Sequence, residues 1–201
     1  MPNHILYIQS SIFGAQGESS RLAAQLVEQL RHRLGDISVT ERRLTADTPH
    51  LDAETFRAII DGKPTPSDDM VAEVQAADVL VIGAPMYNFG IPSPLKAWFD
   101  HIPRAGVTFR YTDKGPEGLL TGKKTYVITT RGGNYKDTAM DAQVPFLRTV
   151  LGFLGLSDVE FIYGEGLNLG SGSRDQGRRA AEAHMVRLAG CYAEQAVAAD
   201  S

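Results

Sequence analysis

The alternation of short apolar segments with helical patterns constrains the fold of this chain more than any other feature. Residues 5–9, 79–83, 125–130 and 159–163 are short, apolar and rich in Val, Ile and Tyr, and the second and third are almost continuously apolar. Such segments are typical of strands that helices cover on both faces. Residues 37–44 alternate apolar and polar side chains before a charged run, which predicts an exposed edge strand.

Helical patterns separate these strands. Leucine recurs every four residues over 22–34, on a helix for which we expect Ser19 or Ser20 as the cap and Gly35 as the end. Further apolar stripes at helical spacing cover residues 95–102, 146–154 and 175–198. This alternation predicts an α/β fold, a three-layer sandwich with a five-stranded parallel sheet, helices on both faces and right-handed crossovers.

Two stretches depart from the alternation. Residues 45–69 contain three prolines and a helical patch at 54–60, and we interpret them as an insertion after the second strand. Residues 104–124 contain four glycines together with Phe109 and Tyr111, which makes them a candidate lid beside a strand end.

Composition narrows the classes of protein. With 201 residues, 43% of them hydrophobic and 22% charged, the chain fits one globular domain over residues 1–201. A net charge of −4 argues against a nucleic acid partner, and the longest apolar stretches are too short to span a bilayer, so we expect no membrane association and a cytoplasmic location. The single cysteine, Cys191, excludes an internal disulfide and is expected to pack inside the last helix. The five histidines share no face or ligand spacing, so we expect no metal.

The first candidate site is the loop of residues 10–20, which leaves the first strand and runs directly into the first helix. Its hydroxyls, its glycines and the free N–H groups of the helix start can surround a phosphate, and the helix dipole favours the negative charge. The loop has neither a Walker A lysine nor the dinucleotide GxGxxG pattern, which disfavours a nucleoside triphosphate or a tightly held NAD. The alternative is that its serines and glycines only cap a helix.

Two more loops follow the third and fourth strands. In a sheet of order 2-1-3-4-5, strands one and three are neighbours whose helices lie on opposite faces, so a crevice opens between their carboxyl ends. Tyr87 and Phe89 offer flat apolar surface for a ring system there, with backbone groups around Asn88 for its polar edge, although such aromatics can also be core residues. After the fourth strand, two glycines permit close approach to a ligand, and Arg131 would bring positive charge where a reduced flavin is anionic. A turn could also use these glycines for conformation alone.

Three stretches carry a resemblance to a known family. They are Ala84-Pro85-Met86-Tyr87-Asn88-Phe89, residues 105–112 with residues 115–119 after them, and Thr130-Arg131-Gly132-Gly133. Through them the chain resembles the FMN-dependent NAD(P)H azoreductases and quinone reductases of bacteria, from Ile5 to nearly the last helix.

This resemblance implies a flavodoxin-like fold, a homodimer with an active site at each subunit boundary, and one non-covalent FMN per subunit. Relatives often carry Ser-Gln-Ser where this chain has Gly17-Glu18-Ser19, and a carboxylate beside a phosphate is unfavourable unless its side chain points to solvent and only its N–H is used. The implied cofactor-binding residues are Ser11, Gly17, Glu18 and Ser19 for the phosphate, Pro85, Met86, Tyr87, Asn88 and Phe89 on one side of the ring, and Thr130, Arg131, Gly132 and Gly133 on the other.

The implied activity is a ping-pong cycle in which NADH or NADPH passes a hydride to FMN and leaves, and a quinone or azo compound then takes the electrons. No acid or base residue is required, and Tyr111 and Phe153 are the candidates for lining the substrate side, with ordinary core packing as the alternative for Phe153. The rival hypothesis from another class is a flavodoxin-type electron carrier, for which we expect a more acidic docking face and no nicotinamide pocket.

Overall fold

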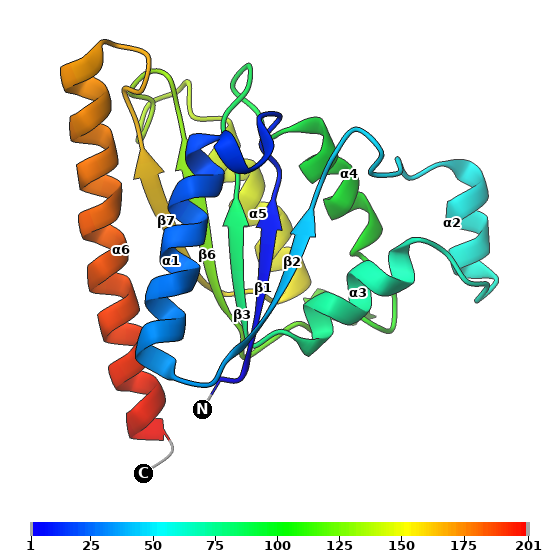
Figure 1. The fold of residues 1–201 in the computed structure, drawn as a ribbon. Helices are drawn as coiled ribbons and strands as arrows, with labels where there is room; N and C mark the ends of the chain where they lie inside the picture. Colours follow the sequence, from blue (N-terminus) through cyan, green and yellow to red (C-terminus); the bar gives the residue numbers. More distant parts are fainter. Residues whose placement is uncertain (1, 200–201) are drawn as a thin grey trace.

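Five parallel strands form the central sheet of the protein, in a computed structural model that describes residues 2–199 (Figure 1). They lie side by side in the order β2 (Ser38–Arg43), β1 (His4–Gln9), β3 (Val79–Gly83), β6 (Lys124–Thr130) and β7 (Asp158–Gly164). Because β6 and β7 are the fourth and fifth strands of this sheet in chain order, the predicted order 2-1-3-4-5 is confirmed.

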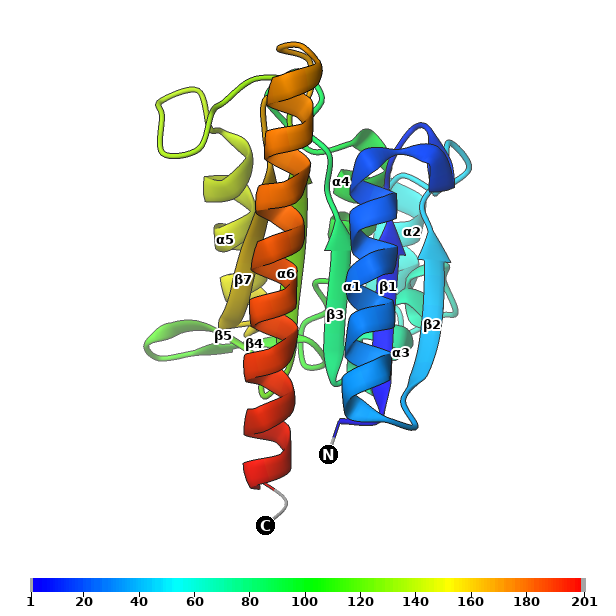
Figure 2. The same ribbon diagram turned by 60° about the vertical axis from the view of Figure 1, so that its left-hand side comes forward.

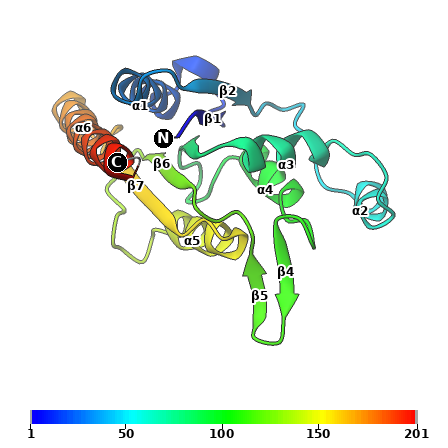
Figure 3. The same cartoon turned by 90° about the horizontal axis from the view of Figure 1, so that it is seen from below.

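Helices cover both faces of this sheet and bury two separate cores, which gives the predicted three layers (Figures 2 and 3). One face carries α1 (Glu18–Leu34) and α6 (Ser171–Ala199), and the other carries α3 (Ser67–Ala76), α4 (Ser93–His101) and α5 (Gln143–Leu154). Successive residues of β1 alternate between the two cores, because side chains along a strand point to opposite faces. Leu6 and Ile8 belong to the core beneath α3, α4 and α5, and Ile5 and Tyr7 to the core beneath α1 and α6.

Helix α1 begins earlier than its serines predict. Its N-cap is Gly17, with φ −67°, ψ 144° and no side-chain cap hydrogen bond, while Ser19 and Ser20 lie inside the first turn. The prediction of a serine cap is therefore wrong, because the chain gives the cap position to a residue without a side chain. Gly35 ends the helix as predicted, and its φ of 84° lies in the left-handed region that favours glycine.

The insertion after β2 contains two helices, of which the sequence predicts only one. Helix α2 (Ala53–Ile60) matches the predicted patch at 54–60. Helix α3 is not predicted, because few of its residues are apolar and they stand among acidic and small residues. Its buried apolar side chains are Met70, Val71 and Val74.

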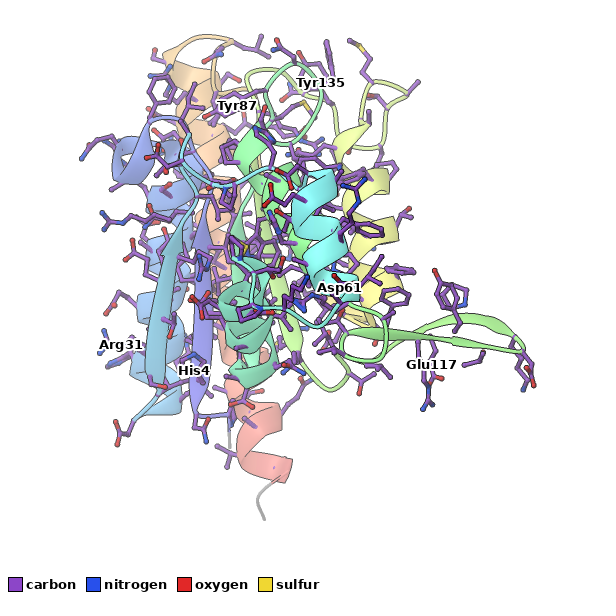
Figure 4. The ribbon with its side chains drawn as sticks, turned by 90° about the vertical axis from the view of Figure 1, so that its right-hand side faces the viewer. His4, Arg31, Asp61, Tyr87, Glu117 and Tyr135 are labelled. Carbon is purple, nitrogen blue, oxygen red and sulfur yellow. The ribbon has the colours of Figure 1, made fainter. Side chains whose placement is uncertain are left out.

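Residues 104–124 contain a β-hairpin instead of an irregular lid. Strands β4 (Phe109–Thr112) and β5 (Gly115–Gly118) pair antiparallel and project from the end of the molecule where the central strands begin (Figures 3 and 4). The end of α5 fixes the base of the hairpin, since Leu120 N–H donates to the carbonyl oxygen of Leu154 at 2.9 Å. The hairpin therefore lies at the opposite end of the molecule from the carboxyl ends of the central strands (Figure 4).

Helix α6 buries only a narrow side of mostly small residues. Ala181, Met185 and Ala189 pack into the core beneath α1 and α6. Cys191 lies outside that side and is exposed, so the expectation that it packs inside the helix layer is wrong. No helix among residues 2–199 has the length and apolar character to cross a membrane.

The contact between the hairpin and the end of α5 gives a stability test. A Cβ on Gly118 would lie 2.0 Å from the backbone nitrogen of Gly155, so we expect Gly118→Ala to lower the free energy of unfolding by about 1–3 kcal/mol, the usual cost of overpacking. Gly172→Ala is the matched control, because nothing lies within 4 Å of its Cβ position, and we expect it to be neutral or slightly stabilising. Urea unfolding measures both variants, and equal stabilities would contradict this packing.

Candidate functional site

A cleft opens at the carboxyl ends of β1, β3 and β6, where the sequence predicts the site. It is a cavity of about 330 Å³ whose walls come from the three predicted loops, the loop after β7 and the first turn of α6. Figure 4 shows this end of the molecule, with Tyr87 and Tyr135 near one another and far from Glu117 of the hairpin. The predicted residues that line it are Ser11, Gly17, Glu18, Ser19, Pro85, Met86, Tyr87, Thr130, Arg131 and Gly132, and the others from these loops, Asn88, Phe89 and Gly133, directly adjoin them in sequence.

The start of α1 forms one end of the cleft. Because Gly17 provides no side-chain cap, the N–H groups of the first turn remain open to the cleft. Gly17 is also required sterically, since a Cβ there would lie 2.1 Å from Ser11 Oγ. Ser19 Oγ is buried in the cleft wall and has no hydrogen-bond partner among the described residues. Open N–H groups, the positive end of a helix dipole and an unpaired hydroxyl together suit a phosphate.

The carboxylate of Glu18 is held away from this helix start. Its Oε2 lies 3.5 Å from Nε of Arg178 on α6, and its Oε1 lies 3.8 Å from Nη1 of Arg21. Glu18 therefore offers the cleft its backbone N–H, while two arginines neutralise its charge.

A tight turn after β3 forms the opposite end of the cleft. Asn88 and Phe89 have φ of 50° and 66°, and paired hydrogen bonds of 3.0 Å join the backbones of Tyr87 and Gly90 on either side. Two successive non-glycine residues in the left-handed region store conformational strain, which clusters at binding sites. The turn places Phe89 at the rim, where its ring centroid is 5.6 Å from that of Tyr135.

A hydroxyl pair connects the two ends of the cleft. Ser11 Oγ lies 3.3 Å from the Tyr87 hydroxyl oxygen, so the loop after β1 and the loop after β3 are linked side chain to side chain. Ser11 Oγ also accepts a hydrogen bond from the N–H of Phe13 at 3.2 Å. The loop that precedes α1 is thereby fixed against the aromatic turn.

The sequence suggested that Arg131 brings positive charge to the cleft. In the structure its side chain carries no free charge there, because carboxylates pair with it. Its guanidinium is fully buried and donates to both carboxylate oxygens of Asp141 at 2.9 Å and to Oε1 of Glu165 at 3.3 Å. The same Glu165 oxygen accepts hydrogen bonds from the N–H groups of Tyr135 and Lys136. Arg131 therefore joins three chain segments from the inside of the protein.

Burial also acts on the phenol next to this ion cluster. The Tyr163 ring lies 5.1 Å from Cζ of Arg131. Burial raises the pKa of Tyr163, although the positive charge of Arg131 acts in the opposite direction. Tyr163 therefore stays neutral at physiological pH and forms an apolar support for the guanidinium.

Two glycines permit the close approach of backbone to this side of the cleft. A Cβ on Gly132 would lie 2.7 Å from the Asn168 amide nitrogen, and one on Gly133 would lie 2.7 Å from the Tyr135 ring. The loop after β7 pairs with them, because Asn168 N–H donates to Gly132 O at 3.0 Å and Gly166 N–H to Gly133 O at 3.1 Å. The neighbouring side chains of Asn168 and Tyr135 therefore leave little room for a Cβ at either position.

The loop after β7 is the part of the site that sequence reasoning missed. Leu167 and Asn168 line the cleft together with Arg174 of α6, and Phe13 and Gln16 line it from the first loop. The sequence did contain a signal for this loop. It follows the fifth parallel strand, and the carboxyl end of that strand lies at the same edge of the sheet as those of the other four.

The two residues predicted to line the substrate side lie outside the cleft. Tyr111 is 77% exposed on the hairpin, and Phe153 packs against Phe109, with ring centroids 4.7 Å apart. The physical reason is the direction of α5, which begins at the carboxyl edge of the sheet and carries Phe153 about 15 Å toward the opposite edge at 1.5 Å per residue. Neither side chain lines the cleft of its own chain.

His101 serves the fold and is not part of a metal site. No group of three or more His, Cys, Asp or Glu residues in this range is arranged to hold a metal ion. His101 is buried with its Nδ1 2.7 Å from Ser67 Oγ and its Nε2 2.9 Å from the carbonyl oxygen of Pro49. These bonds fasten the insertion to α4.

The sequence of this chain matches a known family and curated proteins. The sequence model of a family described by its flavodoxin-like fold aligns with residues 3–188. An FMN-dependent NADH:quinone oxidoreductase of Saccharophagus degradans is 53% identical over 195 residues, which cover 92% of this chain and 93% of that protein. The FMN-dependent NADH:quinone oxidoreductase 2 of Pseudomonas fluorescens is 45% identical over 198 residues, covering 93% of this chain and 100% of that protein.

Solved structures share the fold at lower sequence identity. The azoreductase from Bacillus anthracis strain Sterne superposes with a TM-score of 0.83 at 23% identity, covering 93% of this chain and 98% of that one. An FMN-dependent NADH-azoreductase from Bacillus anthracis strain Ames Ancestor, in complex with FMN, gives a TM-score of 0.79 at 23% identity, with coverages of 93% and 99%. At this level of identity the likeness shows a common fold.

The buried ion cluster around Arg131 can be tested through stability. Arg131→Leu leaves two carboxylates without their cation, so we expect the free energy of unfolding to fall by about 3–5 kcal/mol. Arg31→Leu is the control, because Arg31 and Glu28 form an exposed pair at 3.1 Å, and its loss should cost less than about 1 kcal/mol. Chemical denaturation of both variants decides, and a similar small loss for each would show that the cluster is not structural.

Proposed function

Because the chain belongs to the family with the flavodoxin-like fold, we propose that it is an FMN-dependent NADH:quinone oxidoreductase that also reduces azo compounds. The observation that carries the proposal is the cleft, which has an uncapped helix start at one end and a strained aromatic turn at the other, on neighbouring strands. Relatives at 53% and 45% identity carry the name of the quinone activity, and azoreductases of the same fold support the azo activity.

The residues of the cleft fit the parts of FMN. The phosphate would lie at the start of α1, where open N–H groups and the unpaired Ser19 hydroxyl favour an anion. The isoalloxazine ring would lie between the turn of residues 87–90 and the glycines 132 and 133. Glycine at 17 and 132 keeps these places open, since a Cβ at either position would meet a neighbouring side chain at 2.1 and 2.7 Å.

FMN, when bound, supplies the transfer of two electrons from NADH to a quinone or an azo compound. The protein orients the ring and stabilises negative charge on it. The backbone N–H groups of Gly132 and Gly133 make no hydrogen bond among the described residues, so they are free to donate to the ring. They take the role that the sequence suggested for the Arg131 side chain, whose charge the carboxylates of Asp141 and Glu165 neutralise.

The alternative function, a flavodoxin-type electron carrier, needs an acidic face for docking to a protein partner. At the cleft, however, Arg178 and Arg21 neutralise Glu18, and Arg174 adds positive charge. This balance favours small flat acceptors over a basic protein partner. We place the reaction in the cytoplasm, because highly charged NADH is retained in the compartment where it is made.

We propose further that the enzyme is a homodimer with an active site at each subunit boundary. The hairpin that carries Tyr111 projects away from the body of the subunit (Figure 4), and Phe89 and Met140, in the loops after β3 and β6, leave 43% and 52% of their surface exposed. If Tyr111 lines a substrate site, that site belongs to the partner subunit, because the hairpin lies at the end of its own subunit opposite the cleft. Phe153 then supports the hairpin by packing under Phe109.

Anaerobic reduction tests the proposed activity. The purified full-length protein should be yellow with bound flavin, and NADH should bleach it in the absence of oxygen. A quinone added afterwards should restore the colour, and steady-state rates with quinones and azo compounds should follow ping-pong kinetics. NADPH serves as the comparison nucleotide. A flavin that neither nucleotide bleaches would sink the reductase and favour the electron carrier.

The role of the hairpin can be tested with Tyr111→Ala. Because Tyr111 is 77% exposed and lies outside the FMN cleft, we expect unchanged FMN affinity and fold, with a KM for quinone raised by about tenfold. Val197→Ala is a matched control, since Val197 is also exposed, at 54%, and lies on α6 instead of the hairpin. Sedimentation should show a dimer for the parent protein. A monomer with full activity would refute the shared site.

A further inference from the structure

Helices α1 and α6 lie side by side on one face of the sheet, and both begin at its carboxyl edge (Figures 1 and 2). Arg178 marks their relative height, because it reaches Glu18 in the first turn of α1 at 3.5 Å. A residue four positions before Arg178 stands one turn, or about 6 Å, nearer the start of α6. That residue is Arg174, and it therefore lies just beyond the first turn of α1.

Arg174 faces the cleft with an uncommitted charge. It is part of the cleft wall together with Gly17 and Ser19. Its Nε donates to the carbonyl oxygen of Leu167 at 2.8 Å, which orients the guanidinium and leaves its terminal nitrogens available. Within residues 2–199, no carboxylate lies within 4.0 Å of the Arg174 guanidinium. The other arginine of the pair, Arg178, is occupied by Glu18.

We infer that Arg174 binds the FMN phosphate and neutralises part of its charge, while Arg178 cancels the charge of Glu18 at the same helix start. This inference rests on the proposed function, because it assigns a further residue to the same cofactor site. The phosphate carries between one and two negative charges at neutral pH, and the first loop contributes no lysine or arginine of its own. A guanidinium suits this task because it offers several donors in a fixed plane.

The ion pair of Glu18 is the second part of the same arrangement. A carboxylate at the first position of α1 would repel a phosphate bound to that helix start. Arg178 holds the carboxylate on the α6 side and compensates its charge, so the N–H of Glu18 stays available to the anion. Two arginines one turn apart on α6 therefore serve one phosphate site, one by contact and one by compensation.

Flavin affinities test the contact. We expect Arg174→Gln to raise the Kd for FMN by about 10- to 100-fold, the range for loss of one charge-assisted hydrogen-bonded contact, and to leave the Kd for riboflavin, which has no phosphate, within about twofold. Arg174→Lys should recover part of the FMN affinity. Arg179→Gln, on the same helix outside the cleft, should change neither Kd. Quenching of flavin fluorescence on the full-length, flavin-stripped protein measures each value, and circular dichroism verifies the fold.

The outcomes separate this inference from the proposed function. Parent protein that binds neither flavin would refute the proposed function itself. Parent protein that binds FMN tightly, with Arg174→Gln equally tight or with riboflavin weakened to the same extent, would overturn the role of Arg174 and leave the enzyme assignment intact.

Compensation by Arg178 has its own readout. Arg178→Gln should weaken FMN about tenfold by freeing the Glu18 charge, and the double variant Glu18→Gln with Arg178→Gln should regain that loss. Equal FMN affinities for the single and double variants would show that Glu18 and Arg178 do not act through charge.

Discussion

The buried cluster of Arg131, Asp141 and Glu165 is the interaction on which the cleft depends. Arg131 directly follows β6, Asp141 precedes α5 and Glu165 follows β7, so one guanidinium holds three separate chain segments in place. Asp141 Oδ1 also accepts a hydrogen bond from the N–H of Val144 in the first turn of α5, at 3.1 Å. The backbone of Gly132 and Gly133 lies between these anchors. Since none of the three charges is solvated well, each stabilises the structure only as long as the others are present.

The fold was largely predictable because its signals are local. Apolar runs such as 79–83 and 125–130 identify buried parallel strands, and the leucine spacing over 22–34 identifies α1 without any knowledge of distant contacts. Helix α3 escaped prediction because its apolar face is short. The serine cap was wrong for a tertiary reason, namely that position 17 must leave room for Ser11.

The site was predictable to the extent that position along a strand determines it. Loops at the carboxyl ends of neighbouring parallel strands meet at one edge, and this rule brought Ser11, Tyr87 and Gly132 together. Side-chain partners obey no such rule. Nothing in the sequence pairs Arg131 with a carboxylate 34 residues away, and nothing reveals that α5 carries Phe153 to the far edge. The resemblance to a family indicated the reaction, whereas the ion pairs of the site follow only from the three-dimensional structure.

The charged edge strand β2 limits how copies of this chain meet. Its outer backbone groups have no strand partner in the sheet, and Glu41, Arg42 and Arg43 stand along it. An ion pair with Glu73 of α3 keeps Arg42 at that edge. A strand added from another molecule would have to strip water from these charges, so continuous sheets across molecules are disfavoured. The charges on β2 therefore oppose fibrous stacking of copies of this chain through this edge of the sheet.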